Sequence, residues 1–264
     1  MSRIKVAIES ARGRGAFVPY AVAGDPDQTR SLAVLAALAG HADVLEVGVP
    51  WSDPIADGPE NQMAMQRALA HGATLARTLD LVAELRRSRS TPVVLMTYLN
   101  PILRMGIDRF VAAARDAHVA GLLVTDLPLE EWGAIERPAR DAGLDMIALC
   151  SPTTPDARAA VLARRTSGFL YVVARLGVTG GGMGSDGELG DRIARLRSPD
   201  VNPGRVPLAV GFGISSAADV ARVLEFADAA VVGSAFSAAI REALEAGGDP
   251  AAGADARASE LRGA

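Results

Sequence analysis

The stretch Asp43-Val-Leu-Glu46-Val-Gly-Val-Pro50-Trp-Ser-Asp53-Pro-Ile-Ala-Asp57-Gly-Pro59 decides how the chain is organised. Its first five residues are a short run with Val44, Leu45 and Val47, which predicts a buried strand. Three carboxylates lie within the twelve residues from Glu46 to Asp57. A carboxylate near the end of an apolar strand is partly desolvated, which raises its pKa and suits it to general acid/base chemistry. Asp57 lies in an Asp-Gly-Pro turn and is expected to stay more solvated and ionised.

A purely structural explanation of these acids is open from the stretch alone. Asp-Pro and Asp-Gly are common turn dipeptides, because Asp bonds its own backbone and Gly accepts a positive φ. Glu46 could equally form half of a buried salt bridge. The rest of the chain has to decide between these interpretations.

The composition excludes several classes of protein. With 264 residues and a formal net charge of −4, the chain can bury a large core and has no basic face for nucleic acid. A single cysteine, Cys150, fits a reducing cytoplasm. The three histidines, His41, His71 and His118, lack the spacing of metal ligands, so no metal site is expected. No apolar run reaches membrane-spanning length and no signal-peptide pattern is present, which predicts a cytoplasmic protein without a membrane segment.

Short apolar runs alternate with helical patterns along the chain without a composition break that would mark a linker. Continuous apolar runs are typical of a parallel sheet covered on both faces, and eight of them predict a (β/α)₈ TIM barrel. A doubly wound open sheet is the alternative. The eight predicted strands are 17–23, 44–48, 93–97, 121–124, 145–149, 169–173, 206–210 and 229–232.

We expect one domain over residues 1–264. Its core spans about 15–245, a short extra helix over 3–11 precedes the barrel, and 248–264 form a loosely ordered tail. Active sites of such barrels lie at the carboxyl ends of the strands. Glu46 and Asp57 then share one mouth with Tyr171, Arg175 and Asp126, which favours a catalytic role for the two acids.

Three glycine-bearing segments follow the last three predicted strands. They are Thr179-Gly180, Gly211-Phe-Gly213-Ile-Ser215 and Gly233-Ser234-Ala235. Glycine lets backbone N–H groups approach an anion, and Ser234 opens a helix whose positive end favours negative charge. Because this corner of a barrel commonly holds phosphate, a phosphate site is favoured over plain turns.

These motifs together resemble the tryptophan synthase α subunit family over about residues 15–245. The resemblance is carried by Phe17-Val-Pro-Tyr20, Gly24-Asp-Pro26, the whole Glu46–Pro59 stretch, Asp126-Leu-Pro128, Arg175-Leu-Gly-Val-Thr179-Gly180, Gly211–Ser215 and Gly233-Ser-Ala235. It implies retro-aldol cleavage of indole-3-glycerol phosphate to indole and glyceraldehyde 3-phosphate, a step of tryptophan biosynthesis.

The resemblance also implies roles for individual residues. Glu46 would be the general acid/base at indole C3 and the glycerol hydroxyl, and Asp57 would accept from the indole N–H. Tyr171 would position Glu46, and Thr179 would meet Asp57 when its loop closes. The phosphate would be held by Gly180, Gly213, Gly233 and Ser234.

A partner is implied as well. Members of the family form an α₂β₂ complex with a β subunit, and Asp53 would lie at that interface. No cofactor is expected in this chain, because the pyridoxal phosphate of the complex belongs to the β subunit.

The sequence departs from the family pattern at three places: Val22, Glu60-Asn61 and the glycine-rich loop 177–187. Two alternatives therefore stay open beside the α subunit of a complex. One is a stand-alone indole-releasing lyase, and the other is a weakly catalytic subunit that activates a β partner.

Overall fold

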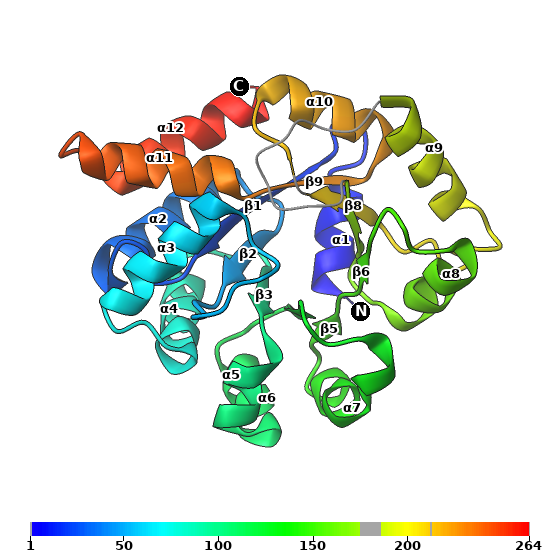
Figure 1. Cartoon of the computed structure of the whole chain (residues 1–264), viewed down its shortest axis with the longest axis horizontal. Helices are drawn as coiled ribbons and strands as arrows, with labels where there is room; N and C mark the ends of the chain where they lie inside the picture. Colours follow the sequence, from blue (N-terminus) through cyan, green and yellow to red (C-terminus); the bar gives the residue numbers. More distant parts are fainter. Residues whose placement is uncertain (1, 175–185, 212, 264) are drawn as a thin grey trace.

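A computed structural model describes residues 2–174, 186–211 and 213–263. Within these residues nine parallel strands form a ring that is surrounded by helices (Figure 1). The hydrogen-bonded order of the strands is β5-β4-β3-β2-β1-β9-β8-β7-β6. The strands are β1 (Ala16–Val22), β2 (Leu45–Gly48), β3 (Val93–Thr97), β4 (Gly121–Val124), β5 (Asp145–Met146), β6 (Leu149–Cys150), β7 (Leu170–Val173), β8 (Leu208–Gly211) and β9 (Ala229–Val232).

The ring closes through the segment from Asp145 to Cys150, which was expected to be one strand. Its first half, β5, pairs with β4, whereas its second half, β6, pairs with β7. The two short strands thus occupy a single position of the barrel and join its two sides. The predicted (β/α)₈ barrel is confirmed, with its fifth strand divided in two.

The helices follow the predicted alternation closely. Those before β5 are α1 (Arg3–Ser10), α2 (Gln28–His41), α3 (Pro59–Ala70), α4 (Leu75–Ser88), α5 (Leu99–Met105) and α6 (Ile107–Asp116). Those after it are α7 (Gly133–Asp141, preceded by a 3₁₀ turn at Leu129–Glu131), α8 (Asp156–Arg165), α9 (Asp186–Arg197), α10 (Ala217–Phe226), α11 (Ser234–Glu245) and α12 (Pro250–Arg262).

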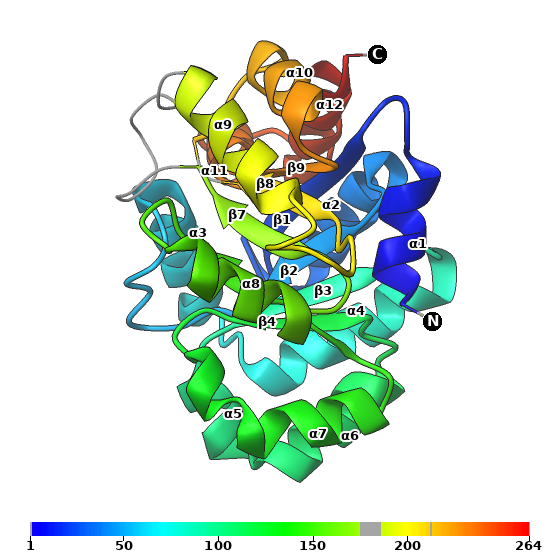
Figure 2. The same cartoon turned by 90° about the vertical axis from the view of Figure 1, so that its right-hand side faces the viewer.

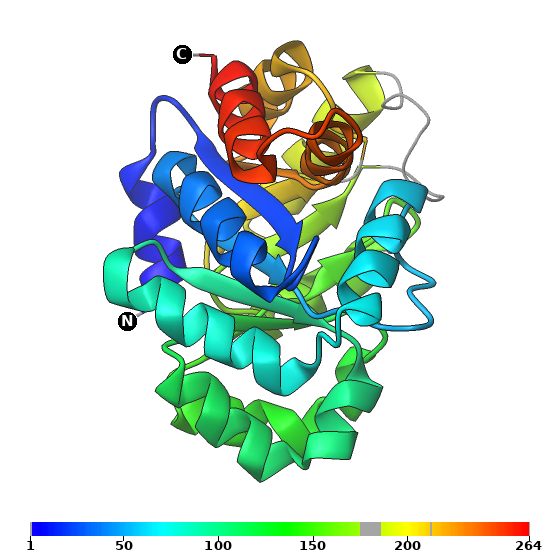
Figure 3. The ribbon, with the colours of Figure 1, turned by 90° about the vertical axis from the view of Figure 1, so that its left-hand side faces the viewer.

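Two apolar layers hold the barrel together. The outer layer packs between strands and helices, and the inner layer fills the barrel with alternate strand residues such as Val18, Val94 and Phe169. Helix α1 belongs to the inner layer, since Ile4 and Ile8 are buried there. It closes the end of the barrel opposite to the start of α3 (Figures 2 and 3). The predicted extra N-terminal helix is therefore the plug of the amino-terminal end.

The carboxyl-terminal segment differs from its expected form. Residues 248–264 were expected to be a loosely ordered tail, but 250–262 form α12, which packs beside α2 and α11 (Figures 1 and 3). The Asp249 side chain accepts from Ala251 N–H and Pro250 occupies the first helical position, so the start is well capped. Ala254 and Ala258 are buried against the barrel helices. Their small side chains give a weak apolar signal, which explains the error.

Helix α5 was not predicted, because its sequence contains Pro101. That proline is the third residue of the helix, where its missing N–H would have had no partner inside the helix. The side chain of Asp126 accepts from the first helical N–H, on Leu99, at 2.7 Å. Asp126, expected at the active-site mouth, thus caps α5.

Candidate active site

A cavity opens at the carboxyl ends of the strands and gathers most of the predicted site residues. Polar and charged groups from β1, β2, α3 and β7 meet there with backbone from the loops after β8 and β9. The residues that line the cavity are Tyr20, Glu46, Asp57, Asn61, Met96, Tyr171, Gly213, Ile214, Val231, Gly233 and Ser234.

Glu46 projects from β2 into the barrel and is only 1% exposed. Among the described residues its Oε1 has no hydrogen-bond partner. Burial, with a further contribution from the charge of Asp57, raises the pKa of Glu46 to about 8. Burial therefore favours the protonated form of Glu46, and Glu46 forms no salt bridge with a described residue, contrary to the structural alternative.

Asp57 precedes α3 and is buried, although it was expected to be more solvated. Its Oδ2 accepts a 2.7 Å hydrogen bond from the phenol of Tyr98. Burial raises the pKa of Asp57, and hydrogen bonds from Tyr98 and Asn61 oppose that shift. The hydrogen bond from Tyr98 and the interaction with Asn61 thus support the ionised form against the effect of burial.

Two tyrosines cross the barrel beside Glu46, and each passes over a glycine. A Cβ on Gly211 would collide with Tyr171 Oη, and a Cβ on Gly48 would collide with Tyr20 Oη. The glycines therefore leave the space that the phenol rings occupy. Burial, followed by the charges of Glu46 and Asp57, raises the pKa of Tyr171 well above its usual value.

Two of the three glycine segments reach the rim of this cavity. Gly213 has φ +84°, a conformation that glycine adopts without strain. Gly233 is the N-cap of α11, and Ser234 is the first residue of that helix. The N-terminus of α11 thus brings unpaired backbone N–H groups and a positive dipole end to the rim.

The other predicted site residues lie elsewhere. Thr179, Gly180 and Arg175 fall outside the described residues. Asp53 is exposed in the loop after β2, where its carboxylate accepts from Ser52 Oγ at 2.6 Å, and it does not line the cavity.

Sequence reasoning missed several residues that line the cavity or support it. Tyr98, which holds Asp57 from outside the lining, directly follows β3, so the rule that placed Glu46 at a strand end could have found it. Tyr20 is the register partner of Glu46 in the pairing of β1 with β2. Asn61 was noted only as a departure from the family pattern. Met96 and Ile214 are apolar, and nothing in the sequence distinguishes an apolar residue that lines a site from one in the hydrophobic core.

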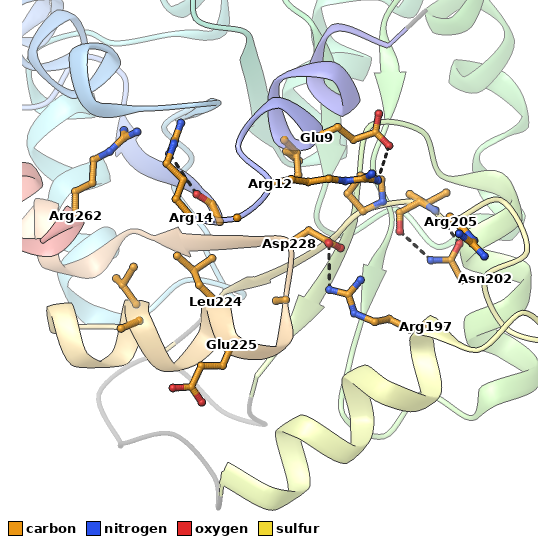
Figure 4. Close-up of a pocket in the computed structure, with 18 of the residues that line it drawn as sticks. Glu9, Arg12, Arg14, Arg197, Asn202, Arg205, Leu224, Glu225, Asp228 and Arg262 are labelled. Atoms are coloured by element: carbon orange, nitrogen blue, oxygen red, sulfur yellow. Dashed lines mark hydrogen bonds and ion pairs between the residues drawn. The ribbon is translucent and has the colours of Figure 1, made fainter.

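A larger hollow lies at the opposite, amino-terminal end of the strands (Figure 4). It is rich in arginine, but most of that charge is neutralised locally. Arg12 pairs with Glu9 at 3.2 Å, and Arg197 pairs with Asp228 at 3.1 Å. Arg14 is paired with Asp43 as well. These ion pairs indicate a structural surface rather than an anion site.

The described part of the chain contains neither a cluster of metal-ligating side chains nor a helix that could span a membrane. Among residues 2–174, 186–211 and 213–263, no three or more His, Cys, Asp or Glu side chains gather as a metal site would require. None of the helices there is long and apolar enough to cross a membrane.

Comparison with known proteins assigns the chain to a family. Residues 6–262 match the family model described as tryptophan synthase alpha chain. The chain belongs to the tryptophan synthase alpha chain family. This assignment supports the interpretation of the sequence as a tryptophan synthase α subunit. It gives no support to the two alternatives, a stand-alone lyase and a weakly catalytic subunit. Family membership implies a lyase of tryptophan biosynthesis.

Individual relatives agree with the assignment to the tryptophan synthase alpha chain family. The tryptophan synthase alpha chain of Gluconacetobacter diazotrophicus is 48% identical over 252 residues, which cover 94% of this chain and 90% of the relative. That of Burkholderia thailandensis is 49% identical over 240 residues, 89% of this chain and 86% of the relative. The crystal structure of the alpha subunit from Legionella pneumophila superposes with a TM-score of 0.89 at 38% identity, and the match covers 100% of this chain and 98% of that one.

Proposed function

We propose that the chain cleaves indole-3-glycerol phosphate to indole and glyceraldehyde 3-phosphate by a retro-aldol reaction. The observation that carries the proposal is the burial of Glu46 in the same cavity as Asp57, which raises the pKa of Glu46 to about 8. C–C cleavage of this kind needs an acid to protonate a carbon and a base to deprotonate a hydroxyl.

Glu46 performs both proton transfers in this proposal. Its carboxyl group protonates indole C3, which gives the indolenine tautomer. The resulting carboxylate then accepts the proton of the glycerol hydroxyl as that carbon becomes the aldehyde and the C–C bond breaks. The bonding electrons return to the indole ring, so indole is released and Glu46 is protonated again. A pKa of about 8 suits a group that must give and take a proton near neutral pH.

Asp57 stabilises the indolenine. Protonation at C3 puts positive charge on the ring N–H, and a fixed carboxylate in a poorly hydrated cavity favours that charge. The hydrogen bond from Tyr98 holds the carboxylate in one orientation. Tyr171 lies beside Glu46 and positions it, while Met96, Ile214 and Val231 supply an apolar wall for the aromatic ring.

The phosphate of the substrate binds at the rim, on the backbone of Gly213, Gly233 and Ser234. The dipole and free N–H groups at the start of α11 favour a dianion there without a lysine. Thr179 and Gly180 complete this binding site in the proposal, as the family resemblance implies.

A β subunit is the proposed partner, in an α₂β₂ complex, and the surface around Asp53 is its contact site. Ile55, two residues on, is 80% exposed, and Leu103 on α5 is 54% exposed. The loop of Ile55 adjoins α5, because Ala56 N–H donates to Tyr98 Oη at 3.1 Å. Exposed apolar side chains beside a charged rim are typical of a protein–protein interface.

The chain itself acts without a cofactor in this proposal, since pyridoxal phosphate belongs to the β subunit. A cytoplasmic location is proposed from the biosynthetic role of the family.

The test is the release of indole and glyceraldehyde 3-phosphate by the purified chain, alone and with a β subunit. We expect both products in equal amounts and faster release with the partner. An Ile55→Asp variant should keep the basal rate and lose the activation. Absence of indole release in every condition would contradict the proposal.

A further inference from the structure

Helix α3 begins two residues after Asp57, and two adjacent residues of it make polar contacts with α11. Arg241 Nε lies 3.2 Å from Glu60 Oε2, and Ser237 Oγ donates to Asn61 Oδ1 at 2.8 Å. Ser237 and Arg241 are four residues apart and therefore share one face of α11. Glu60 and Asn61 are the two adjacent residues that depart from the family pattern, and each has a partner on that face.

The contact with Ser237 orients the Asn61 amide. Both side chains are buried, at 8% exposure for Asn61 and 1% for Ser237. With its oxygen held by Ser237, Asn61 turns its NH₂ group towards the cavity, where Nδ2 lies 3.4 Å from the position of a Cβ on Gly233. A buried amide N–H needs an acceptor, and the carboxylate of Asp57, four residues earlier, lines the same cavity and has its pKa lowered by interaction with the Asn61 side chain.

We propose that Asn61 is a positioning residue for Asp57, with its amide oriented by Ser237 and its N–H directed at the Asp57 carboxylate. The inference rests on the proposed function, because it assigns Asp57 a role that needs an ionised, fixed carboxylate. An aliphatic side chain at this position could offer no donor. The N-terminus of helix α11 lies at the proposed phosphate site. Through Ser237 and Asn61 the same helix also fixes the Asp57 carboxylate, which faces the indole ring in the proposed function.

The titratable groups around Asp57 explain why a hydrogen bond from Asn61 matters for the ionised carboxylate. The titratable groups of the described residues that face Asp57 are Glu46 on β2, Tyr20 on β1, Tyr98 at the start of α5 and Tyr171 on β7. All of them are acids, so none can neutralise the carboxylate as a cation would. Burial raises the pKa of Asp57, and the hydrogen bonds from Tyr98 and Asn61 act against it.

The test compares two neighbouring amides on α3. Asn61→Leu removes a donor to the carboxylate of Asp57. Gln62→Leu removes the Gln62 Nε2 bond to the backbone carbonyl of Asp57, at 2.8 Å, and leaves the carboxylate untouched. The titration of the Asp57 carboxylate is followed by carbon-13 NMR in the free, full-length chain. We expect it to move to higher pH in Asn61→Leu and to stay in place in Gln62→Leu.

Turnover gives the second readout. In Asn61→Leu the acidic limb of the kcat/KM profile should move to higher pH, with a loss of about tenfold at its acidic end, because a hydrogen bond to a charged group contributes on this order. Arg241→Met breaks the neighbouring α3–α11 contact without touching Asn61 and should leave that limb in place. A role that is merely structural would lower stability in both variants and move the limb in neither.

The outcomes separate this inference from the proposed function. An Asp57 titration that is unchanged in Asn61→Leu overturns the inference, even if the wild type is an active lyase. A wild type without lyase activity overturns the proposed function, while the NMR titration still tests the contact. If Asn61→Leu does not fold, Ser237→Ala replaces it. The titration of Asp57 should then move to higher pH in Ser237→Ala as well, and an unchanged titration overturns the inference.

Discussion

The phenol of Tyr98 donates a 2.7 Å hydrogen bond to Asp57 and accepts one from Ala56 N–H at 3.1 Å. The first residue after β3 therefore holds both the carboxylate and the backbone of the loop after β2. Two neighbouring strands of the barrel share one site through this side chain.

Tyr98→Phe removes both contacts and keeps the ring. The pKa of Asp57 should rise, since burial then has one donor fewer to oppose it. The acidic limb of the kcat/KM profile should move to higher pH, and the variant should lose about 1–3 kcal/mol of stability. The measurements are a pH–rate profile and a urea titration. An unchanged acidic limb would contradict the assigned contact.

Glu46 makes the stability of the wild type depend on pH. Its pKa is 4.5 in the unfolded reference and about 8 in the fold, so the folded state binds the extra proton. The free energy of unfolding should therefore fall as pH rises from about 4.5 to about 8 at this group. Glu46→Gln cannot ionise and should lose less stability over that window. Calorimetry at pH 5.5 and 8 compares the two proteins, and equal losses would contradict the raised pKa.

Ser234→Asp separates folding from phosphate binding. A carboxylate in the first turn of α11 is favourable for the helix, so Tm should stay the same or rise. The same charge repels the phosphate of the substrate, so KM should rise steeply. Ser234→Ala is the neutral control, with a smaller rise in KM. An unchanged KM in Ser234→Asp would place the phosphate elsewhere.

Two alanines of α12 test whether this helix is part of the core. Ala254 is fully buried and Ala256 is exposed on the same helix. Ala254→Asp should cost about 3 kcal/mol or more, because it buries an unpaired charge, whereas Ala256→Asp should change little. Chemical denaturation measures both variants. Equal stability would support the loosely ordered tail that the sequence suggested.

Much of the fold followed from local patterns. Apolar runs marked the barrel strands, and the spacing of Ser216 and Asp219 is that of a capping box, which these two residues form at the start of α10. Errors arose where tertiary contacts replace local signals. β5 and β6 became two strands because one run pairs with a different neighbour at each end. Helix α12 has alanine where other helices have larger apolar residues, so its burial cannot be recognised before α2 is in place.

Site residues could be predicted where an ionisable side chain lies at or just after the carboxyl end of a predicted strand. Glu46 was singled out because it lies near the end of an apolar strand, and Asp57 because it lies in the loop that follows that strand; both line the cavity. The burial of Asp57 was missed, since it depends on Tyr98, 41 residues away in sequence. The contacts of Asn61 depend on a side chain of α11, 176 residues away. Such long-range partners leave no pattern in a single sequence.

The most direct test of the account is the turnover of Glu46→Gln with indole-3-glycerol phosphate. The amide keeps the size of the side chain but cannot transfer the proton, so kcat should fall by about 10²–10⁴. Equilibrium binding of the substrate should stay close to that of the wild type, because the phosphate and indole contacts remain. A Glu46→Gln variant with the kcat of the wild type would contradict the assignment of Glu46 as the general acid and base.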